Sequence, residues 1–561
     1  MTQDESLSGA DITAQALEHE GVTHVFGLPG TTVMNLIDAF TRTNLRFVSV
    51  RHEQVAAFMA DGYARASGTP GVCMASRGPG AANLAIGVHN AHAESVPVLA
   101  LVGQVPDEIY YRESFEEIDL THFFAPMTKW QVEVHKVGRI PELLQRAVRT
   151  TLQGRPGAVL ASLPLDVQVA EARPTFQPRR RLSHPAPSAE VVSEAVDLLL
   201  AAERPVVVVG GGLQATEFDD AVIQLLTRLN LPVVSSWMRK NVFPADSPLF
   251  CGSLGYGAFD VTEDLVREAD VVLALGSRFS EFSTKNWSLL GPAAKLIHVD
   301  IADEVIGQVH PPTVGVHASA HLFAVAALDR LAGPGVRSGD EVTARAPEVA
   351  EARRRYLNCA RIPSDLPTND GVASADIVRA LATVIEEIDP ILVQDAPSLG
   401  TWIQRYLELP SPGHFYAAAG GSMGWGLPAA MGIQLARPTE RVLAVCGDGS
   451  FWMVAQDLET AVRENIPVVV VVNNNFAFGN TRDRQRTAHQ GRYSGVFYGN
   501  PDFAAYARLL GAHGERVETA EELVPAIRRA LASGGPAVVD VIQDIHEGLP
   551  PDLVPPPAIT G

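Results

Sequence analysis

Short runs of apolar, mostly β-branched residues recur along the chain, and stretches long enough to form amphipathic helices separate them. Clear examples are the valine-rich runs at residues 206–209, 271–275 and 468–472. Uninterrupted apolar runs of strand length, separated by helix-length segments, indicate parallel strands that are buried on both faces of a sheet. The pattern therefore predicts an α/β protein built from doubly wound parallel sheets.

Two segments interrupt this alternation. Residues 171–190 are rich in Pro and Arg, and residues 333–370 contain several Gly and Pro residues, so both are predicted to be linkers. The three consecutive α/β domains expected from these breaks span residues 1–175, 190–335 and 370–548, and a Pro-rich tail follows at 549–561. No short repeat is present, which leaves open that the first and third domains share a fold without sharing sequence.

Length and charge narrow the range of functions. A chain of 561 residues is too long for a single hydrophobic core, and its net charge of −20 argues against a nucleic-acid-binding protein, because phosphate backbones attract basic surfaces. The longest apolar runs have strand length, so no membrane interaction is expected. Four scattered cysteines without a CxxC pair and a polar, acidic N-terminus favour a cytoplasmic location.

The segment with the clearest chemistry is residues 447–475, which begins with Gly-Asp-Gly-Ser and ends with three asparagines. Both polar groups follow predicted strands, and the carboxyl ends of parallel strands meet at one sheet edge, where ligands bind. The Asp448 carboxylate and an asparagine side-chain oxygen are hard ligands suited to Mg²⁺. The glycines and the following helix N-terminus suit a diphosphate. Without the asparagines, a helix cap at Asp448 or Ser450 would be the better explanation.

This spacing of GDG and NN resembles the signature of the thiamine-diphosphate-dependent enzyme superfamily, and the resemblance to its acetolactate synthase-like branch covers nearly the whole chain. It implies a pyrimidine-binding first domain and a diphosphate-binding third domain. It also implies that Asp448 and Asn475 bind Mg²⁺ together with the main-chain carbonyl of Ala477, and that Asn474 does not. The residues expected beside the diphosphate are Gly449, Ser450, Phe478, Gly479 and Asn480.

The first domain contains Arg-His-Glu-Gln at residues 51–54. In the family that this segment resembles, its glutamate hydrogen-bonds the pyrimidine ring nitrogen N1′ and so activates the cofactor, which implies that role for Glu53. Glu53 must then stay protonated part of the time, which an apolar pocket favours. Taken alone, Glu53 would be a charge at a helix start. Pro79 and Asn83 are expected on the same pyrimidine side.

A glycine-rich segment at residues 417–432 completes the resemblance. It implies that Met423 holds the two cofactor rings in a bent shape and that the Gly421 carbonyl accepts a bond from the 4′-amino group, which is a proximity effect. Without the other motifs, Met423 would be assigned to the core. Four further residues are expected near the diphosphate on a looser match: Ala396, Pro397, Ser398 and Leu399.

The middle domain resembles the FAD-carrying domain of acetolactate synthases. Its turn at residues 210–214 is not the GxGxxG dinucleotide fingerprint, and such a turn is often purely structural. Arg278 either meets a diphosphate or forms a salt bridge. Whether this domain holds FAD, holds ADP or is empty therefore stays open.

Two departures from the acetolactate synthase pattern concern the substrate. Those enzymes usually carry Gln after Phe115, where this chain has Glu116, and Trp where this chain has Arg484. Arg484 is a permanent cation that either binds a carboxylate, sulfonate or phosphate of the substrate or points into solvent. His89 and His92 are either acid/base groups or structural histidines.

The resemblance implies decarboxylation and carboligation of a small 2-oxo acid such as pyruvate, with an aldehyde or a second oxo acid as acceptor. Alternatives are a C–C lyase or acyl transferase of the same superfamily, of the sulfoacetaldehyde acetyltransferase, 2-hydroxyacyl-CoA lyase or aldehyde lyase type, and a non-catalytic paralogue. A scaffold has no need of Glu53, which disfavours the last. Related enzymes combine this glutamate with the metal site of a second subunit, so a homodimer or homotetramer with active sites at the subunit interface is implied.

Overall fold

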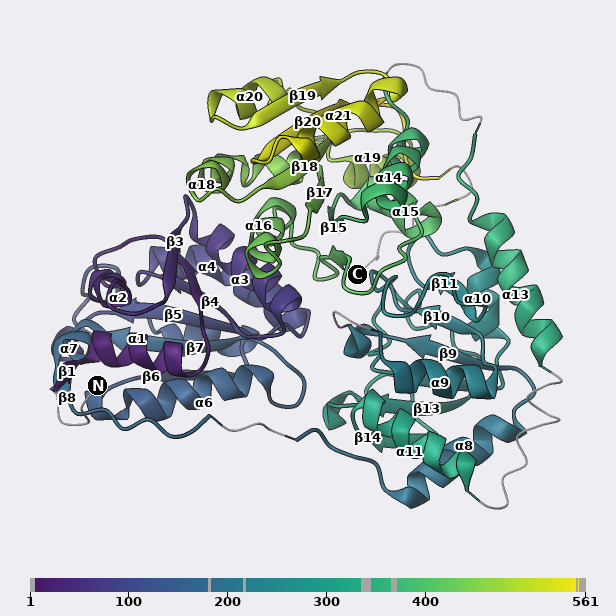
Figure 1. Ribbon diagram of the computed structural model, residues 1–561, viewed down its shortest axis with the longest axis horizontal. Helices are drawn as coiled ribbons and strands as arrows, with labels where there is room; N and C mark the ends of the chain where they lie inside the picture. Colours follow the sequence, from purple (N-terminus) through teal and green to yellow (C-terminus); the bar gives the residue numbers. More distant parts are fainter. Residues whose placement is uncertain are drawn as a thin grey trace.

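The computed structural model describes residues 6–179, 183–214, 218–333, 345–364, 371–550 and 553. The three predicted α/β units are present, each as a six-stranded sheet whose neighbouring strands are all parallel (Figure 1). The predicted fold class is therefore confirmed. The Pro-rich tail at 549–561 lies largely outside the described residues.

The first sheet has three fully buried apolar strands at its centre, β4 (Gly71–Ala75), β5 (Val98–Gln104) and β7 (Val159–Pro164), and more exposed strands at its edges. In spatial order its strands are β3 (Arg46–Ser49), β2 (His24–Gly27), β4, β5, β7 and β6 (Trp130–Glu133). Its helices are α1 (Gly9–His19), α2 (Met34–Phe40), α3 (Glu53–Ser67), α4 (Pro79–Ala93), α5 (Leu120–Phe124), α6 (Ile140–Leu152) and α7 (Leu165–Val169). A short antiparallel pair, β1 (Leu7–Ser8) and β8 (Glu171–Ala172), joins the two ends of this domain.

The middle sheet has the strand order of doubly wound nucleotide-binding folds, 3-2-1-4-5-6 when its strands are numbered along the chain. In spatial order these are β11 (Phe250–Ser253), β10 (Val233–Ser235), β9 (Pro205–Val209), β12 (Val271–Leu275), β13 (Lys295–Asp300) and β14 (Val314–His317). Its helices are α8 (Ala189–Ala201), α9 (Asp220–Leu229), α10 (Asp260–Arg267), α11 (Ala320–Ala332) and α13 (Ala346–Cys359).

The position of α13 corrects one prediction, because this helix falls inside residues 333–370, which were expected to be a linker. Gly and Pro at both ends of the segment obscured a short amphipathic stretch. Val349 and Tyr356 of α13 are buried in the core, and the Arg353 guanidinium donates hydrogen bonds to the main-chain oxygens of Phe250 and Ala245 in the middle domain.

The third sheet has the same strand order as the first, 2-1-3-4-6-5 in each when strands are numbered along the chain. In space it runs β16 (Phe415–Ala417), β15 (Ile391–Asp395), β17 (Val442–Gly447), β18 (Val468–Asn474), β20 (Ala537–Ile542) and β19 (His513–Val517). Its helices are α14 (Ser374–Ile388), α15 (Pro397–Tyr406), α16 (Gly426–Ala436), α17 (Asp448–Trp452), α18 (Leu458–Arg463), α19 (Gly479–Ala488), α20 (Phe503–Leu509) and α21 (Ala520–Ala532). The first and third domains therefore share a topology although no repeat is visible in the sequence.

The first and third domains meet where α3 packs on α16, side by side in Figure 1. Glycines bring the two backbones together. A Cβ atom on Gly62 would lie 2.3 Å from the Ala429 carbonyl oxygen, and one on Gly432 would lie 2.1 Å from the Met59 carbonyl oxygen. Both distances are far below van der Waals contact, so no larger residue fits without moving a helix.

A buried cluster of charged side chains lies beside this contact and reaches all three domains. Asp61 of α3 accepts hydrogen bonds from Arg65 (Nε to Oδ1, 2.6 Å) and from the indole of Trp425 at the start of α16 (2.9 Å). Glu94 accepts from Arg239 of the middle domain and from Arg65. Burial alone would raise the pKa of Glu94, but the two guanidinium groups outweigh burial and lower it. The cluster therefore holds ionised groups out of water at the junction of the domains.

None of the helices in the described ranges is long and apolar enough to cross a membrane.

We expect Gly432→Ala to lower the midpoint of thermal unfolding, with a cost of about 1–3 kcal/mol, because the added methyl group overlaps the backbone of α3. Alanine is the better helix former by up to roughly 1 kcal/mol, so a net loss would come from this contact. Gly499→Ala is the matched control, since a Cβ there meets nothing within 4 Å. Equal unfolding midpoints for the two variants would contradict the close contact of α16 with α3 at Gly432.

Candidate active site

A cavity of about 210 Å³ opens at the carboxyl ends of β15, β17 and β18, the sheet edge that the strand-end rule singles out (Figure 1). Most of the residues predicted from the third domain line it. They are Ala396, Pro397, Ser398, Gly421, Met423, Asp448, Gly449, Ser450, Asn475, Ala477, Phe478, Gly479 and Asn480. The cavity thus brings together groups from four separate segments of sequence.

Asp448 begins α17 directly after β17 and is almost completely buried. Its carboxylate accepts hydrogen bonds from the Gly449 amide (2.8 Å), the Tyr498 hydroxyl (2.9 Å) and the Asn500 side-chain amide (2.8 Å). Burial raises the pKa of Asp448 to about 6, while these donors act in the opposite direction. A cation in the cavity would favour the ionised form further, because an opposite charge stabilises a carboxylate.

The asparagines at the end of β18 differ in their surroundings. Asn473 lines the cavity with a buried side-chain oxygen that has no hydrogen-bond partner in the described part of the chain. Asn474 is turned away, and its amide donates to Asp540 at 2.9 Å. The Asn475 side-chain oxygen accepts from the Ala477 amide at 3.2 Å.

The cavity fits a metal-bound diphosphate. Asp448 is the carboxylate on its surface, and the oxygens of Asn473, Asn475 and Ala477 are further hard ligands of the kind Mg²⁺ prefers. Its walls are also shaped by glycine. A Cβ on Gly449 would lie 2.8 Å from the Phe478 ring and from the Tyr498 hydroxyl, and one on Gly479 would lie 2.9 Å from the side chains of Asn475 and Ser398. A larger residue at either position would therefore push the side chains that line the cavity out of place.

Besides Asn473, sequence reasoning missed three further residues of this site. Tyr498 and Asn500 hold the Asp448 carboxylate from the loop after α19, where no strand or helix period points to them. Asp395 ends β15 and is buried. It accepts from the Ser450 hydroxyl (3.2 Å) and the Gly426 amide (2.9 Å), and burial raises its pKa to about 7. The strand-end rule that identified Asp448 also applies to Asp395.

Not every predicted residue reaches the cavity. Leu399 is fully buried in the hydrophobic core of the third domain, so its side chain faces away from the cavity. Phe115 and Glu116 lie in a loop of the first domain, where Arg77 donates to the Phe115 carbonyl (2.7 Å) and pairs with Glu116 (3.8 Å). The Phe115 side chain is 77 % exposed.

Glu53 occupies a different place from the metal-site residues within this single chain. It begins α3, is 7 % exposed, and accepts a hydrogen bond from the Asn83 amide at 2.9 Å. Pro79 begins the next helix, α4. Contacts to the third domain hold both flanks of Glu53, because the Arg51 amide donates to Asp457 and the Gln54 side chain donates to the Met453 carbonyl. Glu53, Asn83 and Pro79 do not line the cavity.

The two histidines singled out in the sequence lie apart from this cavity as well. His89 is exposed, and His92 has a buried Nδ1 atom that finds no hydrogen-bond partner in the described ranges. Burial, reinforced by nearby cationic groups, lowers the pKa of His92.

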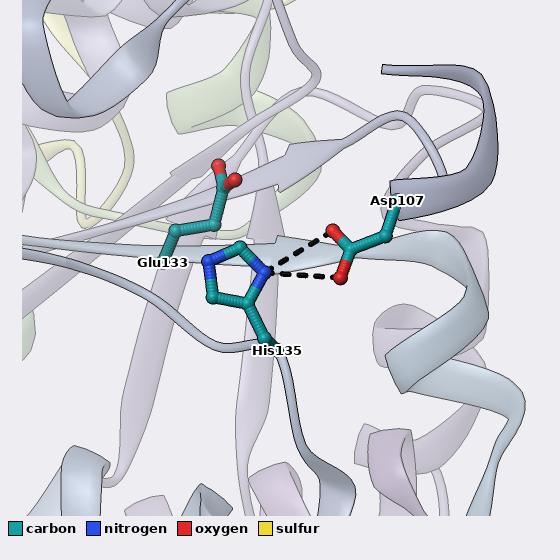
Figure 2. A group of neighbouring side chains, drawn as sticks. All are labelled: Asp107, Glu133 and His135. Atoms are coloured by element: carbon teal, nitrogen blue, oxygen red, sulfur yellow. Dashed lines mark hydrogen bonds and ion pairs between the residues drawn. The ribbon is translucent and has the colours of Figure 1, made fainter.

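One group of metal-capable side chains lies elsewhere, in the first domain. Figure 2 shows Asp107, Glu133 and His135, with His135 Nδ1 placed 3.0 Å and 3.2 Å from the two Asp107 oxygens. Asp107 and His135 are exposed, and Glu133 already accepts from the Ser162 hydroxyl at 2.9 Å. The group does not belong to the cavity at the third sheet.

A larger hollow lies around the middle domain. A cavity of about 630 Å³ lies between the first and middle domains and reaches Ala419 and Gly420 of the third. A second cavity of about 820 Å³ lies over the middle domain and shares Gly212, Gly276 and Asp300 with the first, so the two are continuous. Where the two cavities meet, the backbones at Gly212 and Gly276 lie close together, since a Cβ on Gly276 would lie 2.7 Å from the Gly212 Cα.

Cationic groups line the larger hollow. Arg278 of the middle domain donates to the Ala93 carbonyl of the first domain (2.8 Å), and Arg155 of the first domain donates to the Ser95 hydroxyl (2.8 Å), so both bind neutral groups. Arg239, by contrast, is paired with Glu94. In the described part of the chain no carboxylate is bonded to Arg155 or Arg278, and two such guanidinium groups suit an anionic ligand between the domains.

Comparison with known proteins agrees with this arrangement. Family models match residues 7–123 as the N-terminal TPP binding domain of thiamine pyrophosphate enzymes, residues 192–331 as their central domain and residues 395–541 as their C-terminal TPP binding domain. The chain is 34 % identical to a probable acetolactate synthase large subunit of Methanocaldococcus jannaschii, over 98 % of this chain and 94 % of that protein. It is 31 % identical to the acetolactate synthase large subunit of Haemophilus influenzae (97 % and 96 % covered) and 30 % identical to the isozyme 1 large subunit of Escherichia coli (98 % and 96 % covered).

We expect Asp448→Asn to weaken Mg²⁺-dependent retention of thiamine diphosphate by roughly 10- to 100-fold, because the exchange removes the carboxylate from the cavity while keeping its shape. Equilibrium dialysis with increasing Mg²⁺ measures the effect. Asp107→Asn is the matched control, since it alters the exposed group of Figure 2 instead. Equal retention in Asp448→Asn and the native protein would refute the metal site.

Proposed function

This chain belongs to the thiamine-diphosphate-dependent enzymes, in the acetolactate synthase-like branch, and we propose that it condenses small 2-oxo acids with loss of carbon dioxide, forming acetolactate from pyruvate. The observation that carries the proposal is the cavity at the third sheet, where Asp448, Asn475 and Met423 line one space. The proposal is further supported by the similarity of the chain to acetolactate synthase large subunits over nearly its whole length.

Different residues of the cavity would bind the metal ion, the diphosphate and the rings of the cofactor. Asp448, Asn475 and the Ala477 carbonyl would hold Mg²⁺, and Gly449 and Gly479, which line the same cavity, let the neighbouring side chains pack closely around the diphosphate. Bound thiamine diphosphate would supply the electron sink for making or breaking a carbon–carbon bond next to a carbonyl. The apolar side chain of Met423 would support the rings and fix their mutual position.

Glu53 is proposed to hold a proton at the pyrimidine ring nitrogen. The Asn83 amide donates to one carboxyl oxygen, Oε2, which orients the group. Gly80 leaves space beside the other oxygen, because a Cβ there would lie only 3.2 Å from Oε1. A ring nitrogen approaching from that side would meet an oriented, mostly buried carboxyl group.

Since Glu53 does not line the cavity of its own chain, we infer that the active unit is at least a dimer in which Glu53 of the partner subunit completes the site. The surface near the cavity supports this inference. It carries large, partly exposed apolar side chains, a composition typical of protein interfaces. They are Trp452, Met453, Phe478, Tyr493 and Phe497.

The first test is acetolactate formation from pyruvate by the purified protein supplied with thiamine diphosphate and Mg²⁺. We expect product, and we expect Glu53→Gln to reduce turnover by at least about 100-fold while cofactor retention stays near the native value. Glu108→Gln, an exposed position of the same domain, is the control. Mixing the Glu53→Gln and Asp448→Asn proteins under subunit exchange should restore activity, because one site of each mixed dimer is intact.

A cofactor-loaded protein that makes no acetolactate would overturn this substrate assignment. It would favour the C–C lyase or acyl transferase activities of the same superfamily. Failure of the mixed variants to regain activity, with mixed dimers demonstrated, would instead contradict the shared site.

We further propose that the middle domain carries FAD. The hollow supports a dinucleotide over ADP because its two continuous cavities extend from the middle domain to Gly420, beside the thiamine site. Arg155 and Arg278 would face the FAD diphosphate, and Gly212 and Gly276 would let it approach the backbone.

We expect the purified protein to release FAD on heat denaturation, identified by fluorescence and mass, and Arg278→Met to lower its content about tenfold. Arg204→Met, an exposed change in the same domain, should leave the FAD content unchanged. Release of ADP, or of no nucleotide from protein refolded with added FAD, would contradict the proposal.

A further inference from the structure

A separate cavity of about 260 Å³ lies next to the proposed cofactor site, between the middle and third domains. The middle domain supplies Trp237, Met238 and Phe282, and the rings of Trp237 and Phe282 stack with centroids 4.7 Å apart. The third domain supplies polar side chains, Gln404 from α15 and Arg484 from α19. One wall is therefore apolar and aromatic and the other is polar.

The cavity collects buried polar atoms that have no hydrogen-bond partner in the described residues. They are the Tyr256 hydroxyl, both side-chain amide atoms of Gln404, the Gln394 side-chain oxygen and Nε of Arg484. Gln404 and Gln394 are only 6 % and 3 % exposed. A buried polar atom without a hydrogen-bond partner is destabilising, so several around one space indicate a site that a polar ligand fills.

The charge of this cavity favours an anion. Arg484 makes no ion pair within the described ranges, because the neighbouring Asp483 carboxylate is bonded to Arg482 (3.1 Å) and Arg486 (3.4 Å). Burial raises the pKa of Tyr256 to about 12, although nearby Arg484 opposes the rise, so its hydroxyl remains a donor. Asp395 also lines the cavity, but its oxygens accept from Ser450 and Gly426.

The cavity is connected to the proposed cofactor site. The two share Ala396, Pro397, Gly421, Met423 and Asn480. Asn480 and Arg484 lie four residues apart on α19, which places Arg484 about 6 Å further along the helix from the diphosphate side. A molecule reacting at the cofactor could therefore extend toward Arg484.

We propose that this cavity binds the anionic group of the acceptor substrate, with Arg484 as its counter-ion and Tyr256 and Gln404 as hydrogen-bond donors. The acceptor is a small carbonyl compound that carries a carboxylate, sulfonate or phosphate, while Trp237 and Phe282 contact its apolar part. This inference rests on the proposed function, because the cofactor defines where the carbonyl group reacts.

The test measures binding of unreactive anions to protein loaded with thiamine diphosphate and Mg²⁺. Calorimetric titrations with oxamate, methanesulfonate and inorganic phosphate should give binding of at least one anion to the native protein. Arg484→Met should weaken it about tenfold or more, because a charge-assisted pair is lost. Arg492→Met, an exposed change of equal charge, is the control. The anion whose affinity falls most in Arg484→Met shows whether the acceptor carries a planar carboxylate or a tetrahedral sulfonate or phosphate.

Tyr256→Phe provides a second measurement that separates binding from folding. It removes a buried hydroxyl that has no hydrogen-bond partner among the described residues, so the unfolding midpoint should not fall, while anion affinity should drop. Equal anion binding in native and Arg484→Met proteins, or none in the native protein, would overturn the proposal. If anions bind through Arg484 but pyruvate gives no acetolactate, the proposed reaction fails and the anion site stands.

Discussion

The close contact of α3 with α16 fixes how the two half-sites of one chain are placed relative to each other. Gly62 and Gly432 let the two helix backbones approach so closely that even a methyl group on either residue would collide with a carbonyl oxygen of the other helix. Glu53 begins α3, and the loop carrying Gly421 and Met423 leads into α16. Small residues in the middle of two helices therefore set the positions of chemical groups at their ends.

In both the first and the third domain, the candidate functional groups lie at the carboxyl ends of parallel strands. Both sheets have the strand order 2-1-3-4-6-5, and both place candidate groups in segments that follow strands. Glu53 follows β3, and Asp448 follows β17. The middle sheet has a different order and contributes walls instead, through Arg278 toward one hollow and Trp237 toward another. The first and third domains, which share a topology, therefore each supply half of a site. The middle domain supplies the surfaces around these half-sites.

Sequence reasoning predicted the fold class because the strands are buried on both faces and therefore appear as continuous apolar runs. It identified Asp448 and Asn475 because polar residues directly follow such runs. Tyr498 and Asn500 could not be found in this way, since a loop carries them back to Asp448 and loops have no period. The helix α13 was missed because only two of its side chains, Val349 and Tyr356, are buried. The Leu399 side chain lies in the core although Ser398 lines the cavity, because a helix turns adjacent residues to different sides.

The buried cluster of Asp61, Arg65, Glu94 and Arg239 has a consequence for how the protein comes apart. Separating the middle domain from the first would strand Glu94 and Arg239 without each other, and separating the third would remove the indole that Asp61 accepts from. An ion left alone in a buried position is several kcal/mol less stable than a paired one. Detaching the middle domain therefore breaks an ion pair, and detaching the third breaks a buried hydrogen bond to a charged group, so the cluster couples the unfolding of the three domains.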